Sequence, residues 1–280
     1  MAARPLLRLF PALLAAAILG LLAAGCSSRP TYPKAQMAES LQQILQSDSL
    51  NTRVRFIDHT LAVQLEYPDA LTQREGQIGI GPSFDDAARR VLTAVHRVLL
   101  SSDAEVRFYV LLISDPNVPG AYLTLVRYLD DIKRANANMI DTFEMFARTI
   151  IELDFVGPSH LTLEQYVPRD IRLEEFLSWQ LARRIQYTLS DELQAEGVAS
   201  VGRCGGKFQD GEFAFTLNVE PLGEAGLDEA TIHKVFQTST GVIAKVLSSY
   251  RFDEFDRIRL IHPLTGRNLV LPRTNLEIFR

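Results

Sequence analysis

The most reactive side chain in the body of the chain is that of Cys204, within the segment Arg-Cys-Gly-Gly-Lys at residues 203–207. Positive charge nearby lowers the pKa of a thiol and makes the thiolate a nucleophile. Nucleophilic catalysis also needs a general base and a group that orients this base. Neither stands near Cys204 in the sequence. We therefore interpret it as a structural thiol and keep an anchored hydrolase that uses Cys204 as the third functional hypothesis.

The histidines are candidates both for that base and for metal binding. They are scattered along the chain at His59, His96, His160, His233 and His262. No HExxH or His-x-His spacing occurs, and no cysteine pair accompanies them, as the common metal motifs require. We therefore expect no catalytic residue, no metal site and no cofactor, although residues far apart in a sequence can converge in a fold.

Two aspartates recur at matching places in two similar segments, Asp58 in residues 56–67 and Asp210 in residues 208–219. A pair of carboxylates between two units could carry out acid–base chemistry. Asp also tolerates turn conformations, and Asp210 precedes a glycine in a strong two-residue hairpin signal. We therefore predict that both aspartates are turn residues.

A glycine-rich stretch at residues 76–82 precedes an expected helix that begins with a capping pattern at Ser83. A helix N-terminus can bind phosphate, but the Gly-Lys-Ser/Thr ending of a P-loop is missing. Asp85 and Asp86 occupy the first turn, where they complement the helix dipole and repel an anion. We expect a loop without an anion site.

Aromatic residues on the expected strands suggest a cavity between a sheet and a helix. The residues that could line it are Phe108, Tyr109, Phe213 and Phe215. Aromatic residues are common on the half-buried surfaces of strands, where they usually form the core. A small-molecule or lipid-binding module is therefore kept as the alternative to the favoured function.

The N-terminus carries a targeting pattern. Arg4 and Arg8 are followed by an apolar run that ends in small residues, as in a secretory signal peptide. Its end, L-A-A-G-C at residues 22–26, resembles the lipobox of bacterial lipoproteins. This resemblance implies cleavage before Cys26 and a lipid anchor, such as palmitate, on that cysteine. Ser27, where an Asp would suggest inner-membrane retention, favours the outer membrane facing the periplasm.

An uncleaved transmembrane helix is the alternative interpretation, because the run approaches the roughly 18 to 20 apolar residues that span a bilayer. A plain membrane anchor has no reason to end in small residues and a cysteine, so we favour the lipoprotein. The membrane is then a partner through the N-terminal lipid.

Charge and cysteine content exclude two other classes. Removal of residues 1–25 would change the net charge from −5 to −7, without the basic excess that nucleic-acid binding usually requires. With Cys26 lipidated, Cys204 has no partner within the chain, so disulfides do not hold this protein together. We expect no nucleic-acid partner, and the oligomeric state is not indicated.

Hydrophobic periodicity predicts the elements that position these residues. We expect helices at residues 34–47, 83–99, 132–153, 170–189 and 228–249, and strand pairs at residues 54–67, 106–128, 208–219 and 258–271. In the middle helix, an apolar seam has heptad-like spacing and is interpreted as the face of a core helix. Its members are Met139, Phe143, Phe146, Ile150 and Leu153.

The chain also contains an internal similarity. Residues 56–67 align with residues 208–219 at a constant offset of 152, and Phe, Asp, Ala and Leu recur identically. The order of the elements then repeats, which indicates a duplication. We predict an α+β fold of two similar antiparallel helix-hairpin-helix-hairpin subdomains joined by long helices. The expected divisions are a signal peptide at 1–25, a lipidated tether at 26–34, a first repeat unit at 35–128, a helical connector at 129–170 and a second repeat unit at 171–280.

These observations favour a non-catalytic lipoprotein that serves as an assembly, scaffold or protein-interaction component of the cell envelope. The expected partner is another envelope protein. A scaffold should show an exposed apolar surface, a small-molecule binder should show an enclosed pocket, and a hydrolase should show His or Asp beside Cys204.

Overall fold

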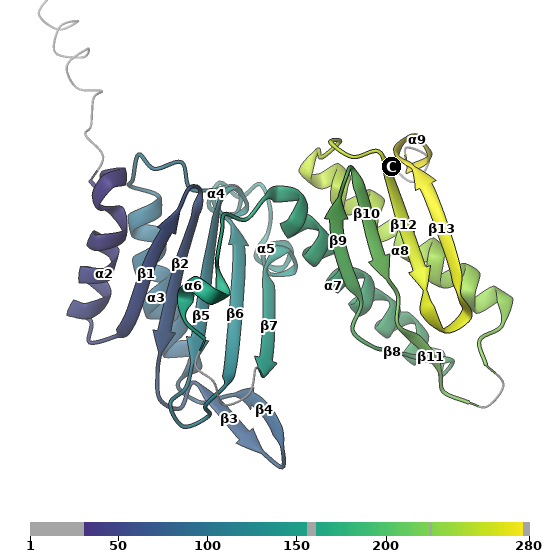
Figure 1. Cartoon of the computed structure of the whole chain (residues 1–280), viewed down its shortest axis with the longest axis horizontal. Helices are drawn as coiled ribbons and strands as arrows, with labels where there is room; N and C mark the ends of the chain where they lie inside the picture. The colour runs from purple at the N-terminus through teal and green to yellow at the C-terminus, as the bar shows by residue number, and fades with distance from the viewer. Residues whose placement is uncertain (1–30, 156–160, 224–225, 277–280) are drawn as a thin grey trace, which may run out of the picture.

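The computed structural model describes residues 31–155, 161–223 and 226–276, so the expected signal peptide and Cys26 lie outside the described residues. A first unit, residues 31–155, and a second unit, residues 173–276, each contain a sheet with two helices on one face (Figure 1). A linking segment, residues 161–172, lies between them in the chain.

The elements of the first unit are η2 (Lys34–Gln36), α2 (Met37–Ser47), β1 (Asn51–Ile57), β2 (Thr60–Glu66), β3 (Leu71–Arg74), β4 (Gln77–Ile80), α3 (Phe84–Leu99), β5 (Phe108–Ser114), β6 (Ala121–Tyr128), α4 (Leu129–Asn136), α5 (Thr142–Arg148) and β7 (Ile150–Phe155). The linking segment contains α6 (Leu163–Tyr166). The elements of the second unit are α7 (Leu173–Ala195), β8 (Ala199–Val201), β9 (Gly205–Gln209), β10 (Glu212–Thr216), β11 (Val219–Pro221), α8 (Glu229–Tyr250), β12 (Arg257–His262), η3 (Pro263–Thr265), β13 (Arg267–Pro272) and α9 (Arg273–Leu276).

The two large sheets share a strand order. The first sheet runs β1-β2-β5-β6-β7, and the second runs β9-β10-β12-β13. In both sheets the two central strands are parallel, β2 with β5 and β10 with β12, and the flanking pairs are antiparallel. The first sheet adds β7, antiparallel to β6. The order of the strands therefore recurs, while the duplication of the sequence stays a prediction.

The predicted fold class is wrong, because both sheets are mixed rather than antiparallel. Helix α3, between β2 and β5, and helix α8, between β10 and β12, each carry the chain back to the end of the large sheet where β2 or β10 begins. The next strand must then run parallel to that strand. Two further sheets, β3-β4 and β8-β11, accompany the large ones. The units are joined by short elements and the strand β7, not by long helices.

The expected helix at residues 132–153 is also wrong. Helix α4 ends before Asn138, which has a positive φ of 54°. The side chain of Asp141 then caps α5 by accepting a hydrogen bond from the Glu144 N–H. The β-branched residues at 149–151 leave the helix, and β7 forms because the edge of β6 offers backbone partners. A heptad-like spacing therefore spans two helices, a turn and a strand.

Several local predictions are confirmed. Strands β1 and β2 form the expected hairpin, and strands β9 and β10 form its counterpart. The expected helices at residues 34–47 and 170–189 correspond to α2 and α7. The prediction that the glycine-rich residues 76–82 form a loop is wrong, because β4 occupies most of this stretch. Ser83 precedes α3 without a side-chain cap, so that predicted capping pattern is wrong as well.

The first sheet is covered on both faces. Helices α2 and α3 pack on one face, against side chains such as Leu61 and Leu111. Side chains of the linking segment and of Phe176, at the start of α7, pack on the other face against Ala62 and Val110. The beginning of the second unit therefore closes the core of the first.

A buried polar joint connects the two units. The Asp131 carboxylate of α4 accepts hydrogen bonds from Arg148 Nη1 at 2.8 Å and from the Tyr250 hydroxyl of α8 at 2.6 Å. Gln180 of α7 donates to the Tyr250 hydroxyl at 2.9 Å and to the Arg148 carbonyl at 2.7 Å. The Arg148 guanidinium also lies 4.7 Å from the centre of the Tyr250 ring. Four helices from both units thus meet at one connected network.

Within the described ranges, no helix combines the length and the apolar composition that a membrane span requires.

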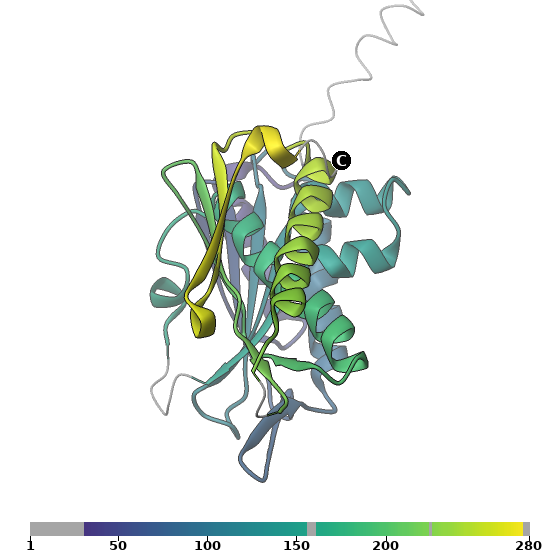
Figure 2. The same ribbon diagram turned by 90° about the vertical axis from the view of Figure 1, so that its right-hand side faces the viewer.

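The two views at right angles show that α4 and α5 project sideways from the body of the first unit (Figures 1 and 2).

Candidate functional site

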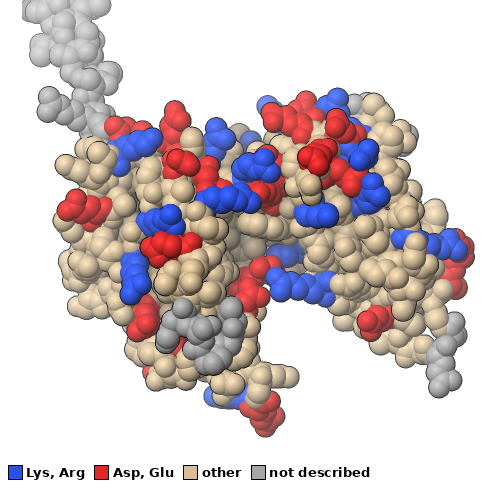
Figure 3. Space-filling view, viewed as in Figure 1, with Lys and Arg blue, Asp and Glu red and all other residues tan. Residues whose placement is uncertain are grey.

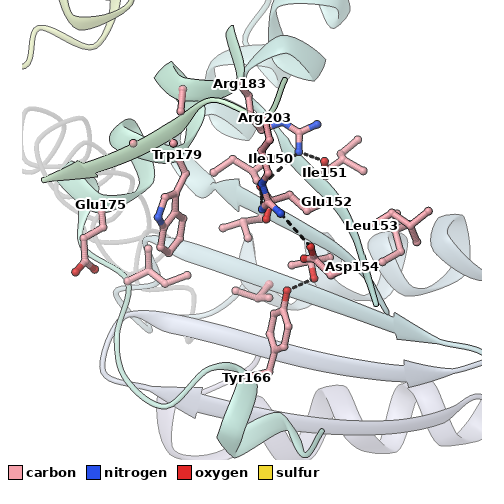
Figure 4. A pocket seen from close by; sticks show the side chains of 18 of the residues that line it. Ile150, Ile151, Glu152, Leu153, Asp154, Tyr166, Glu175, Trp179, Arg183 and Arg203 are labelled. Carbon is pink, nitrogen blue, oxygen red and sulfur yellow. Dashed lines mark hydrogen bonds and ion pairs between the residues drawn. The ribbon is translucent and has the colours of Figure 1, made fainter. Parts of the chain in front are cut away.

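An open cleft of about 1050 Å³ separates the two units. Its walls come from β7 and the adjoining face of the first sheet, from the linking segment, from α7 and from the start of β9. The space-filling view shows the molecule hollowed between the units, with charged side chains at the hollow (Figure 3). Figure 4 shows the lining side chains at close range.

Two unpaired strand edges border this cleft. Strand β7 pairs only with β6, and β9 pairs only with β10, among the strands of the described chain. The Ile151 carbonyl points away from β6, because it accepts a hydrogen bond from Arg183 Nη1. Backbone groups of a strand alternate with a period of two residues, so those of Leu153 point toward the same free edge. An edge of this kind can pair with another extended chain.

Arginines of the second unit reach across the cleft to carboxylates of β7. Arg203 Nη2 lies 3.2 Å from Glu152 Oε1, and Arg203 Nη1 lies 3.4 Å from Asp154 Oδ1. Arg183 Nη1 lies 3.8 Å from Glu152 Oε1. Arg203 remains 70% exposed as a side chain, so these pairs are solvated and contribute little to stability. They bridge the two walls and place charged groups where a ligand could meet them (Figure 4).

Helix α7 adds exposed aromatic surface to the cleft. Trp179 is 40% exposed and Tyr187 is 56% exposed, and both line the cleft. Arg183 stands between them on the helix and donates from Nη2 to the Tyr187 hydroxyl at 2.8 Å. Trp, Tyr and Arg are the residue types that most often dominate the binding energy of protein interfaces. This face of α7 therefore has the composition of a docking surface.

Two polar side chains that line the cleft, Tyr166 and Glu175, are paired with neighbouring residues of the protein. Burial raises the pKa of the Tyr166 hydroxyl, which is hydrogen-bonded to Thr124 Oγ1 and stays protonated at neutral pH. The guanidinium of Arg169 binds both carboxylate oxygens of Glu175, at 2.7 and 2.9 Å, and this hydrogen bonding lowers the pKa of Glu175. Neither group is available as a general base of near-neutral pKa.

Two adjacent glycines allow β9 to approach α7. A Cβ atom on Gly206 would lie 2.2 Å from the Ser178 carbonyl oxygen, so only glycine permits this contact. In the sequence, the only signal of this contact is the Gly205-Gly206 pair beside Cys204. Its role is to let one face of β9 pack closely against α7.

Cys204 lines the cleft without the features of a nucleophile. Its side chain is buried, and burial raises the pKa of the thiol. The Cys204 N–H donates to Gln186 Oε1 at 3.2 Å. Among the described residues, no hydrogen bond or ion pair links the Cys204 Sγ to a His, Asp or Glu side chain. The environment opposes thiolate formation instead of promoting it.

The structure places the other candidate residues apart. Asp58 and Asp210 have positive φ angles of 48° and 50° and occupy hairpin turns of different sheets, as predicted for turn residues. The four aromatic candidates are buried in the cores and do not line the cleft. His160 lies outside the described residues. In the described ranges, no group of three or more His, Cys, Asp and Glu side chains is arranged to hold a metal ion.

One histidine belongs to a cluster that the sequence did not indicate. Arg127 Nη1 donates to the Tyr109 hydroxyl at 3.2 Å, and that hydroxyl lies 2.8 Å from His96 Nε2. A guanidinium can only donate, so the hydroxyl donates in turn to a neutral His96. Burial, and then the Arg127 charge, lower the pKa of His96 to about 4. This cluster lies in the core of the first unit, away from the cleft.

Comparison of the sequence with protein-family models and with curated proteins gave no match. The residues of the cleft are therefore the main indication of function. The sequence indicated these residues only weakly, because they lie in three separate segments. These are β7, which was predicted to be helical, one face of α7, and the Gly205-Gly206 pair.

Proposed function

We propose that this protein is a lipid-anchored component of the bacterial cell envelope, held at the outer membrane facing the periplasm, whose cleft binds a segment of another envelope protein. The resemblance of residues 22–26 to a lipobox supports the anchor and the location. The cleft supports the interaction role. The protein is then an assembly or scaffold component without catalytic activity of its own.

The observation that carries the proposal is the pair of unpaired edges, β7 and β9, bordering one open cleft. A strand edge offers a row of backbone donors and acceptors, which an extended polypeptide satisfies by adding a strand. Exposed Trp179 and Tyr187 offer side-chain contacts beside these edges. An extended segment of a partner protein fits both features.

The two other functional hypotheses have less support. Small-molecule sites enclose most of the ligand surface, whereas this cleft is open between the units (Figure 3). A hydrolase that uses Cys204 would need a thiolate, and burial raises the pKa of this thiol.

The proposal is tested by site-specific photo-crosslinking in the native envelope. A photo-reactive amino acid at Tyr187 should give one defined adduct with a partner protein. The same amino acid at Leu264, which is similarly exposed on η3, is the matched control and should not give that adduct. Trp179→Ala should lower the yield of the adduct from position 187 by roughly tenfold. This corresponds to a loss of about 1.4 kcal/mol of binding free energy when an aromatic interface residue is removed. Equal adducts from both positions, or a yield unchanged by Trp179→Ala, would exclude the cleft as the binding site.

The anchor is tested separately. Cys26→Ser should block lipid attachment and processing, so that the variant migrates more slowly than the wild type and no longer fractionates as a processed outer-membrane protein. Normal cleavage and normal outer-membrane fractionation of the variant would refute the lipid anchor.

A further inference from the structure

An apolar tip projects from the first unit at residues 137–146, where α4 turns into α5 (Figure 2). Met139 is 72% exposed, Phe143 is 83% exposed and Phe146 is 52% exposed. Phe143 and Phe146 are three residues apart in α5 and therefore share a face of the helix. Monomeric soluble proteins seldom expose such clusters without an interaction that uses them.

The exposure of the tip is held by the fold. The Met139 N–H donates to the Arg134 carbonyl at 2.8 Å, and the Glu144 N–H donates to Asp141 Oδ1 at 2.7 Å. At the base of α5, the Glu144 carboxylate binds Arg148 at 2.8 Å and Arg184 at 3.0 Å. These contacts fix both ends of the turn, so its apolar side chains are presented outward in a defined arrangement.

We infer that this tip inserts into the bilayer that carries the lipid anchor. The inference rests on the lipid attachment at Cys26 in the proposed function. The Tyr32 N–H is tied to the Ser101 carbonyl, and the Lys34 N–H donates to Asp103 Oδ1 at 2.6 Å. Tyr32 lies six residue steps after Cys26, so even a fully extended chain holds it within about 20 Å of the membrane surface.

The start of the described chain lies at the top of the molecule, and Figure 2 shows the α4–α5 turn in the upper part, projecting to one side. The β12–β13 turn, which carries Leu264, lies toward the opposite end (Figure 1). A short anchor therefore brings the tip, and not the β12–β13 turn, toward the bilayer.

The composition of the tip fits lipid better than protein. Phe and Met have no polar group that needs a partner, and aromatic side chains bind readily at the boundary between headgroups and acyl chains. The neighbouring charges are balanced, because Asp130 pairs with Arg134 at 3.2 Å, Glu144 pairs with Arg148, and exposed Lys133 is offset by exposed Asp141. Paired charges give little attraction to anionic headgroups, so insertion should depend on apolar contact and persist at high salt.

The experiment uses the full-length lipidated protein, reconstituted into phosphatidylcholine vesicles with and without lipids that carry a nitroxide quencher on their acyl chains. Trp179, the single tryptophan of the chain, is replaced by Phe, and one new tryptophan is introduced by Phe143→Trp or by the matched control Leu264→Trp. Thermal melts of both variants check that these exposed substitutions leave the fold intact.

Fluorescence at position 143 should be quenched roughly three to five times more than at position 264, because a side chain at the interface lies within about 5–10 Å of the acyl boundary. The difference should survive 1 M salt, at which the screening length is about 3 Å. Equal quenching in protein that is bound to the vesicles would overturn the inference and leave the anchor intact. A protein adduct from a photo-reactive amino acid placed at position 143 in the native envelope, together with vesicle quenching no greater than the control, would overturn it in favour of a protein interface. Failure of the lipidated preparation to bind vesicles would refute the anchor and the inference together.

Discussion

The two large sheets have the same strand order but differ in burial, because the first is covered on both faces and the second has one face in water. All seven residues of β5, in the first sheet, are buried, whereas burial alternates along β12, its counterpart in the second. Strand register places Val110 of β5 beside Ala62, and it places Arg259 of β12 beside Ala214. Val110 and Arg259 thus occupy the same place in the two sheets, one buried in a core and one partly exposed.

The difference arises because residues at the start of the second unit help to cover the first sheet. The linking segment and the start of α7 cover the second face of the first sheet. The corresponding face of the second sheet stays in water, where Glu212 binds Arg259 at 2.8 Å and also pairs with Arg257. The cleft lies where the cover of the first sheet ends, beside β7. One topology therefore supports a closed core in one unit and a solvated sheet in the other.

The sharpest test of this contrast exchanges the two equivalent residues. Val110→Arg would bury a charge without a partner, and we expect it to lower the free energy of unfolding by more than about 4 kcal/mol. Arg259→Val removes a solvated ion pair and should change it by less than about 1 kcal/mol. Urea denaturation followed by circular dichroism measures both. Similar losses in the two variants would show that the two faces are not differently covered.

The second test compares a buried ion pair with an exposed one. Arg148→Ala leaves the Asp131 carboxylate buried without its cation, and burial already raises the pKa of Asp131. We expect a loss of about 3–5 kcal/mol and weaker coupling between the units, visible as a broadened or biphasic melt. The control is Arg257→Ala in the solvated pair with Glu212, with an expected loss below about 1 kcal/mol. A single sharp transition of unchanged midpoint for Arg148→Ala would contradict the role of the joint.

The smallest expected effect is a pH dependence confined to the first core. Register places Tyr109 where the second sheet has Ile258, so only the first core carries the hydroxyl that binds His96. The pKa of His96 falls from 6.5 to about 4 on folding. Between these pH values the unfolded chain binds a proton that the folded chain does not, so acidification from pH 6.5 toward pH 4 lowers stability, by up to about 3 kcal/mol.

His96→Gln keeps an acceptor for the Tyr109 hydroxyl but cannot take up this proton. Urea denaturation of both proteins at pH 7 and pH 5 should therefore show a smaller loss on acidification for the variant. An identical loss of unfolding free energy in both proteins would mean that protonation of His96 does not contribute to the pH dependence of stability.

Much of the local structure could be predicted from the sequence. The periods of α2 and α7 predicted their buried faces, and the hairpin turns at Asp58 and Asp210 were predicted from turn chemistry. At the start of α6, the side chains of Thr162 and Gln165, three residues apart, form a capping box. These features depend on residues a few positions apart, so a sequence pattern contains the information that specifies them.

The helix–strand boundary at residue 150 is a case that the pattern could not decide. Phe143 and Phe146 have the spacing of a helical core face, yet both are exposed in α5, while Ile150 begins a strand. Short apolar runs fit either period, and the free edge of β6 favoured the strand. The sequence pattern could not predict the cleft for the same reason, since β7 forms one of its walls.

The sequence by itself determined the hairpin turns at Asp58 and Asp210 and the apolar faces of α2 and α7, and it contained the lipobox-like segment from which the anchor is predicted. The tertiary structure decided the parallel pairing of β2 with β5 and of β10 with β12, and it joined Asp131, Arg148 and Tyr250 in one buried network. It also decided that two strand edges border a cleft. Contacts within a turn or a helix depend on short sequence spacings, whereas pairing across the fold depends on which apolar faces and unpaired edges remain once the local elements have formed.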